Sequence, residues 1–125
     1  MQVLLDTHIF YWTLYEHARQ PALATKLITE ADSVYVSAAS VWELAIKVRI
    51  GKLRADIDEV IASIEPAGFV ELPVASRHSA QVAKLPLHHT DPFDRMLIAQ
   101  AICEPLYLLT VDSQLSVYSD LVIRV

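Results

Sequence analysis

Apolar and polar residues follow two different patterns along this chain. Short apolar runs predict buried strands, and these cover residues 2–5, 33–36, 69–72, 106–110 and 121–125. Longer segments with apolar positions three or four residues apart predict helices, which cover residues 8–17, 21–31, 38–50, 76–85 and 92–103. The segment 56–68 holds a further helix, which Pro66 should end. A short helical turn is expected after Asp112. Strands that alternate with helices in this way indicate an α/β fold, with a parallel sheet covered by helices on both faces.

Proline and glycine mark the expected ends of several helices. Pro21 stands at the start of the second helix, where a missing N–H costs nothing. Gly51 is placed to end the third helix, and Pro66 to end the fourth. Because the chain has only two glycines, helix should dominate.

The composition is that of one folded domain over residues 1–125. Hydrophobic residues make up 54% of the chain, which is enough for a core and argues against disorder. No apolar run approaches the roughly 18 residues needed to span a bilayer, and "MQVLLD" lacks the features of a signal peptide. The single cysteine, Cys103, is expected to be a buried free thiol. These features together suggest a reducing, cytoplasmic location.

The charge of the chain is unevenly distributed. Its net charge of −5 argues mildly against a general nucleic-acid coat protein, which is usually basic. Residues 47–54, "KVRIGKLR", nevertheless carry four cations and no acid. They suit a helix C-terminus, where cations favour the macrodipole, and equally a role on phosphates.

Four acidic residues are expected to meet at one rim of the sheet. Asp6 directly follows the first predicted strand, and Asp112 the fourth. Glu43 lies in the helix that follows the second strand. Asp94 lies in the first turn of the helix 92–103, which must begin at the same rim to return the chain to a parallel strand. Ligand sites in such folds lie at this carboxyl-end rim.

Four carboxylates in one pocket would repel each other unless a cation joins them. Oxygen ligands alone suit Mg²⁺ or Mn²⁺. Such an ion binds phosphate oxygens and lowers the pKa of a bound water, so hydrolysis of a phosphodiester is the chemistry that this set predicts.

Each acid also has a structural interpretation. Asp6 and Asp112 could cap the helical segments that follow them. Glu43 has capping-box spacing from Ser40 and could pair with Lys47 one helical turn later. Taken singly these roles are the better explanation, but four acids at one rim are hard to explain as four unrelated structural roles.

The segment "DPFDRMLIAQA" contains two acids at the start of one helix. Asp91 precedes a proline and is a natural N-cap. Asp94 would then occupy the third helical position, where the dipole favours an acid. Both a structural and a functional role remain open for it on these grounds.

The segments "LLDTH", "SVWELAIK", "DPFDRMLIAQA" and "LLTVD" resemble the PIN domain, in particular the VapC toxins of type II toxin–antitoxin systems. The resemblance covers nearly the whole chain and implies a five-stranded parallel sheet of order 3-2-1-4-5 between helices. It also implies a Mg²⁺-dependent ribonuclease, with Mn²⁺ possible. The metal ligands and catalytic residues it implies are Asp6, Glu43, Asp94 and Asp112. The family's spacing to Ala99 and Ala101 selects Asp94 rather than Asp91, for which an outer-shell role stays open.

The resemblance further implies an RNA substrate, a cognate antitoxin protein as partner and a homodimer. Four aromatic residues in "IFYWTLY" predict either a thick core helix or a groove for the antitoxin between the helices 8–17 and 21–31. Trp12 is its expected anchor. No histidine is needed for the metal site: His8, His88 and His89 lie near the predicted rim, but they lack the spacing of a zinc site and are interpreted as polar surface residues.

Three alternatives belong to other classes. A signalling receiver also gathers acids around Mg²⁺, but "QVLLD" offers only one acid and "LLTVD" no lysine. A haloacid-dehalogenase-type phosphatase would require D-x-D, which "DTH" does not provide. An inactive binding module that keeps the PIN fold is the third, and the intact set of four acids argues against it.

Overall fold

The computed structural model describes all residues, 1–125. Five strands alternate with six α-helices and two short 3₁₀ helices. The strands are β1 (Gln2–Leu5), β2 (Ser33–Ser37), β3 (Phe69–Leu72), β4 (Tyr107–Thr110) and β5 (Val122–Arg124). The α-helices are α1 (Thr7–Tyr15), α2 (Ala22–Glu30), α3 (Ala38–Arg49), α4 (Ile57–Ser63), α5 (Ser76–Lys84) and α6 (Pro92–Cys103). The 3₁₀ helices are η1 (His17–Arg19) and η2 (Ser113–Tyr118).

The strands form one parallel sheet in the order β3-β2-β1-β4-β5. This confirms the expected fold class and strand order. Leu5 pairs with Leu109 at the last rung between β1 and β4, so the segments that follow these two strands leave the sheet side by side. A receiver-like domain has the order 2-1-3-4-5. The topology therefore excludes that alternative.

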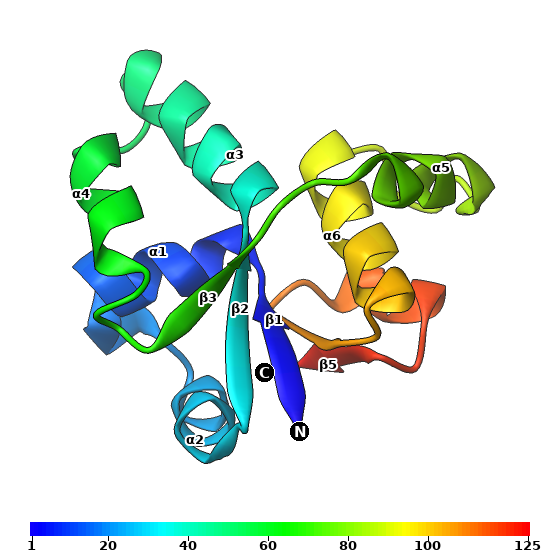
Figure 1. Ribbon diagram of the computed structural model, residues 1–125, viewed down its shortest axis with the longest axis horizontal. Coiled ribbons are helices and arrows are strands. Elements are labelled where there is room, and N and C mark those ends of the chain that lie inside the picture. Colours follow the sequence, from blue (N-terminus) through cyan, green and yellow to red (C-terminus); the bar gives the residue numbers. More distant parts are fainter.

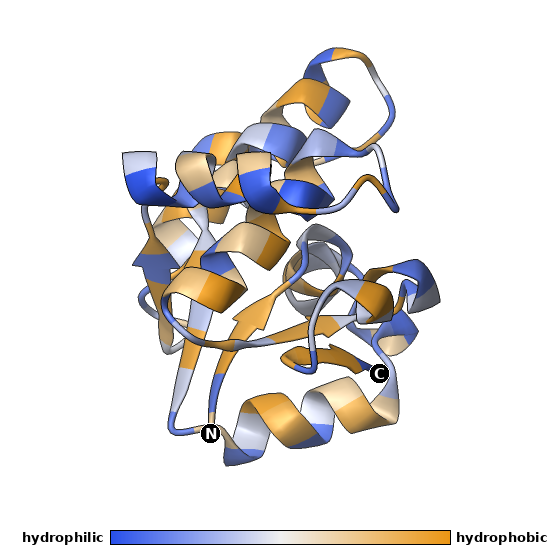
Figure 2. Cartoon of the chain, turned by 90° about the vertical axis from the view of Figure 1, so that its right-hand side faces the viewer, coloured by the Kyte–Doolittle hydropathy of each residue, from blue (hydrophilic) through white to orange (hydrophobic).

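Helices cover both faces of the sheet, as Figure 1 shows, with α1, α2 and α4 on one side and α5 and α6 on the other. Each face has its own buried cluster. Phe10 of α1 is fully buried in the first, and Leu97 of α6 in the second. The strands at the centre of the molecule are mostly hydrophobic in Figure 2, as expected for strands that are covered on both faces.

Two predicted helices end earlier than expected. The helix predicted over residues 8–17 stops at Tyr15, and η1 follows it. The helix predicted within 56–68 stops at Ser63, before Pro66, and turns lead to Gly68. Gly68 has a φ of 83°, a conformation that favours glycine. Apolar periodicity continues through these turns, so it could not show where the helical hydrogen bonds stop.

Cys103 is half-buried rather than fully buried, because it lies in the last turn of α6 with its sulfur 3.8 Å from the carbonyl oxygen of Arg77. It is a free thiol, as expected. The longest helices have 12 residues, and none is both long and apolar enough to cross a bilayer.

The helices α1, α3 and α6 all begin at the carboxyl-end rim of the sheet, the upper end in Figure 1. Asp6, Ser37 and Asp91 are their respective N-caps, and each accepts a backbone N–H through its side chain. Three helix starts therefore surround the end of β1, where the acids were expected.

Candidate active site

Asp6 lies at the end of β1 and is almost completely buried, with 3% of its surface exposed. One carboxylate oxygen accepts the N–H of Ile9 at 2.9 Å, which caps α1. The other accepts the hydroxyl of Thr110 at 2.7 Å. The Thr110 hydroxyl also accepts the backbone N–H of Asp112 at 3.1 Å. Thr110 thus joins the two acids that follow the neighbouring strands β1 and β4.

Glu43 points inward from the second turn of α3 and is 7% exposed. Its Oε2 pairs with the ammonium of Lys47 at 2.9 Å. Its Oε1 is buried without any hydrogen-bond partner. The capping box considered with Ser40 does not form, because α3 begins at Ala38 and the Ser40 hydroxyl instead accepts that of Thr7.

The two acids at the start of α6 have different surroundings. Asp91 accepts the N–H groups of Phe93 and Asp94 at 2.8 and 3.1 Å, so its carboxylate is the N-cap expected from the sequence. Asp94 is half-buried and accepts no backbone N–H; its Oδ2 lies 2.9 Å from Nε2 of His89. The Asp94 carboxylate is therefore the one left available for a ligand.

His89 was interpreted as a polar surface residue near the rim, but it is half-buried and its imidazole contacts Asp94. One ligand atom each from His89, Asp94 and Asp112 lies within 4.8 Å of the other two. The other two histidines, His8 and His88, are exposed as expected. The loop that carries His89 is shaped by residues of α6 and η2, which helix and strand patterns do not reveal.

The pKa values of several site residues are shifted by burial and by the charges of neighbouring residues. Burial raises the pKa of Asp6 above its usual range, and the nearby charge of Glu43 adds to this effect. Burial likewise raises the pKa of Asp94 to about 6, with further contributions from the charges of Asp91, Glu43 and Asp6. The hydrogen bond to Asp94 raises the pKa of His89. The charge of Glu43 thus disfavours the ionisation of both Asp6 and Asp94, and the charge of Asp6 also acts on Asp94.

These residues fit a divalent cation. The orphaned Oε1 of Glu43 is a buried oxygen that lacks a partner, and an ion or its water would supply one. Carboxylates whose ionisation is disfavoured by their neighbours would be stabilised by the same charge. Asp94 and Asp112 are the two acids of the group that also contains His89, whereas Asp6 and Glu43 lie outside this group and hold protein partners.

The sequence reasoning did not assign a role to Arg95, which holds the loop at the rim. Its buried guanidinium donates to the carbonyl oxygens of Val82, Leu85, Pro86 and His89, and to the hydroxyl of Tyr118, at 2.8 to 3.3 Å. It forms no ion pair with a carboxylate. Its place one residue after Asp94 was the only available signal, because four of its five partners are backbone atoms.

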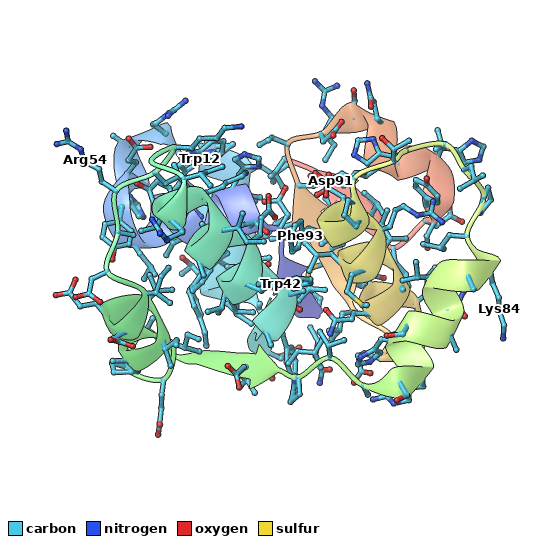
Figure 3. All side chains as sticks on the ribbon, turned by 90° about the horizontal axis from the view of Figure 1, so that it is seen from above. Trp12, Trp42, Arg54, Lys84, Asp91 and Phe93 are labelled. Carbon is cyan, nitrogen blue, oxygen red and sulfur yellow. The ribbon has the colours of Figure 1, made fainter.

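Two hollows flank the acids. A pocket of about 530 Å³ lies between α3, α5 and α6, and Figure 3 shows Trp42 and Phe93 facing each other there. A smaller groove of about 240 Å³ lies between α1 and α3, lined by Trp12, Arg19 and Lys47 among others. No groove is found between α1 and α2, where one was expected, because Phe10 of α1 and Ala24 of α2 are packed into the same core.

The groove between α1 and α3 is lined by aromatic and charged side chains. The Arg19 guanidinium lies 5.5 Å from the centre of the Trp12 ring, and Lys47, which also lines the groove, pairs with Glu43. Tyr11 is buried and donates its hydroxyl to the carbonyl oxygen of Arg54. Part of the aromatic set is therefore core, as one of the two interpretations held, and Trp12 is left at the groove.

Comparison with known proteins agrees with the fold. The model of the PIN domain matches residues 3–121. Ribonuclease VapC22 of Mycobacterium tuberculosis is 31% identical over 115 residues, which cover 90% of this chain and 88% of that protein. The crystal structure of VapBC2 from Rickettsia felis, bound to a promoter DNA fragment, superposes with a TM-score of 0.73 at 16% identity, over 100% of this chain and 98% of that one. A toxin–antitoxin complex from Klebsiella pneumoniae gives 0.66 at 14% identity, over 97% and 95%. With its fold, its motifs and this match over almost its entire length, the chain belongs to the PIN domain family.

Proposed function

We propose that this protein is a metal-dependent endoribonuclease and the toxin of a type II toxin–antitoxin pair. The observation that carries the proposal is the convergence of four acids from separate parts of the chain at one rim of a PIN fold. The relation to a curated VapC ribonuclease supports RNA as the substrate.

The proposed roles follow from the surroundings of each acid. Asp94 and Asp112, with ligand atoms near one another at the mouth of the site, hold the ion. Asp6 is more deeply buried, and its carboxylate accepts a hydrogen bond from the Thr110 hydroxyl. It is proposed to complete the acidic cluster on its buried side. Mg²⁺, or Mn²⁺ in its place, supplies charge that binds phosphate oxygens and lowers the pKa of bound water.

Glu43 is proposed to orient the attacking water. Its Oε1 is free of protein partners and buried, and its other oxygen is held by Lys47. A carboxylate that is held at one oxygen and free at the other can accept a hydrogen bond from a water molecule through the free oxygen. Glu43 would therefore position the attacking water from α3.

The groove between α1 and α3 is proposed as the place where an antitoxin segment binds. It is lined by Trp12 and by Lys47, the partner of Glu43, so an apolar segment with a basic side chain would lie beside this pair. Such a cation would offset the carboxylates in place of a metal. The toxin–antitoxin complexes among the structural neighbours support a partner of this kind.

A homodimer is also proposed, through the outer face of α3. Trp42, Ile46 and Ile50 are exposed by 63%, 38% and 60%. Their spacing of four residues places them in one stripe along the helix. A continuous apolar stripe of this kind is typical of an interface.

An inactive module that keeps the PIN fold is the other candidate. Incubation of purified protein with single-stranded RNA distinguishes the two. We expect cleavage with MgCl₂, loss of cleavage with excess EDTA and recovery when MgCl₂ is restored. No cleavage of any RNA at any metal concentration, by protein that is folded and free of antitoxin, would favour the inactive module.

A further inference from the structure

The loop before α6 brings a nitrogen atom to a site otherwise composed of oxygen. Nε2 of His89 lies 2.9 Å from Oδ2 of Asp94, and both lie within 4.8 Å of a carboxylate oxygen of Asp112. Two ligand atoms at adjacent corners of an octahedron with bonds of about 2.1 Å lie about 3.0 Å apart. The spacing between these two side chains therefore already matches that of neighbouring metal ligands.

The position of His89 does not depend on its contact with Asp94. Its backbone N–H donates to the hydroxyl of Tyr118 at 2.7 Å, and its carbonyl oxygen accepts from the guanidinium of Arg95 at 3.3 Å. Arg95 is buried in α6 and Tyr118 belongs to η2, so two elements outside the loop fix the backbone of His89 from both sides. The imidazole is thus directed at the acids by the fold itself.

We propose that His89 is a metal ligand beside Asp94 and Asp112, and that it makes this site favour Mn²⁺ over Mg²⁺. The inference rests on the proposed function, since it concerns the same metal site. Mg²⁺ prefers oxygen ligands and keeps several waters, whereas first-row transition metals accept imidazole nitrogen more readily. One nitrogen among carboxylates therefore raises affinity for Mn²⁺ more than for Mg²⁺.

Pulsed electron paramagnetic resonance of Mn²⁺ bound to the whole protein tests the contact directly. Coupling of the Mn²⁺ electron spin to a ¹⁴N nucleus is expected in the wild type. It should disappear in His89→Gln and persist in His88→Gln, a matched control because His88 is the exposed neighbour in the same loop. Bound Mn²⁺ without ¹⁴N coupling in the wild type would overturn the inference.

Calorimetric titration with MnCl₂ and MgCl₂ supplies the second readout, with circular dichroism to verify that each variant is folded. His89→Gln should weaken Mn²⁺ binding by about tenfold or more and Mg²⁺ binding by much less. Equal losses for the two ions, or no loss for either, would contradict a ligand that selects the metal. Asp94→Asn distinguishes a wrong metal site from a wrong assignment of His89. If this variant leaves the Mn²⁺ affinity unchanged, the proposed metal site itself is wrong, whatever His89 does.

Discussion

Asp94 is a residue whose ionisation depends strongly on its surroundings. Burial and the neighbouring acids raise its pKa to about 6 from the ordinary 3.8. The folded protein therefore holds this proton more tightly than the unfolded chain does. The stability that this proton contributes to the folded protein is fully present below about pH 4. It is lost as the pH rises from the ordinary pKa toward the pKa of the folded state. A bound cation removes this cost at neutral pH, because it stabilises the ionised form.

We predict that Asp94→Asn stabilises the metal-free protein at pH 8, because a neutral amide replaces a carboxylate whose ionisation is disfavoured. Thermal unfolding in EDTA should show a Tm about 3 to 5 °C above the wild type, corresponding to roughly 1 kcal/mol. Near pH 4 the two proteins should melt together, since Asp94 is then protonated in the wild type. A variant that melts lower than the wild type at pH 8 would contradict this account of Asp94.

The residues of the site differ in how far the sequence could predict them. Asp6 and Asp112 could be placed because they lie one and two residues beyond the ends of strands, and the direction of a parallel strand determines at which rim it ends. His89 could not, because the loop that aims it depends on Arg95 and Tyr118, whose hydrogen bonds leave no periodic pattern. The predicted caps of Asp6, Asp91 and Asp112 form, so the structural interpretation is confirmed for these three acids, whereas the role of Asp6 and Asp112 at a metal site stays a prediction.

At the scale of elements, the strand–helix order was predictable because apolar periodicity reports buried faces directly. The ends of the helices were less predictable, as the early end of α4 at Ser63 shows. The groove beside α1 was assigned to the wrong neighbour. Aromatic content indicated that α1 has a second apolar face, but only the three-dimensional packing shows that α3, rather than α2, lies across from it.

Arg95 is predicted to hold the rim loop to α6. Arg95→Met removes its five hydrogen bonds and leaves several carbonyl oxygens without a donor. We expect a loss of about 2 to 3 kcal/mol in the free energy of unfolding by urea, with faster hydrogen exchange in residues 82–90. Arg77→Met is the matched control, since the Arg77 side chain is 58% exposed. Equal stability of the two variants would contradict the role given to Arg95.

Trp12 is predicted to anchor the antitoxin in the groove between α1 and α3. Trp12→Ala should weaken binding of the cognate antitoxin by about 2 kcal/mol or more, with RNA cleavage largely retained. Tyr15→Ala is the control, because Tyr15 is exposed on the same helix and lies outside this groove. Isothermal titration of both folded variants measures the effect. Unchanged affinity for Trp12→Ala would contradict the proposal that the antitoxin binds in this groove.

At the scale of the whole molecule, the apolar stripe on α3 predicts self-association. Trp42→Asp should convert a dimer into a monomer, because it places a charge in the middle of the stripe. Light scattering after size-exclusion chromatography measures the mass. Ile61→Asp is the control, since Ile61 is 48% exposed on α4 and does not belong to the stripe. A wild type that is monomeric at all concentrations would refute the proposed dimer.

The central claim is that the fold gathers its acids into a metal site that cleaves RNA, and Asp94 and Asp91 offer the sharpest comparison. They stand three residues apart at the start of α6, and only Asp91 is used as a cap. Single-turnover cleavage of one RNA in MgCl₂ should fall by orders of magnitude in Asp94→Asn. It should remain near wild type in Asp91→Asn, since asparagine also caps helices. Cleavage that survives in Asp94→Asn and is lost in Asp91→Asn would contradict the account.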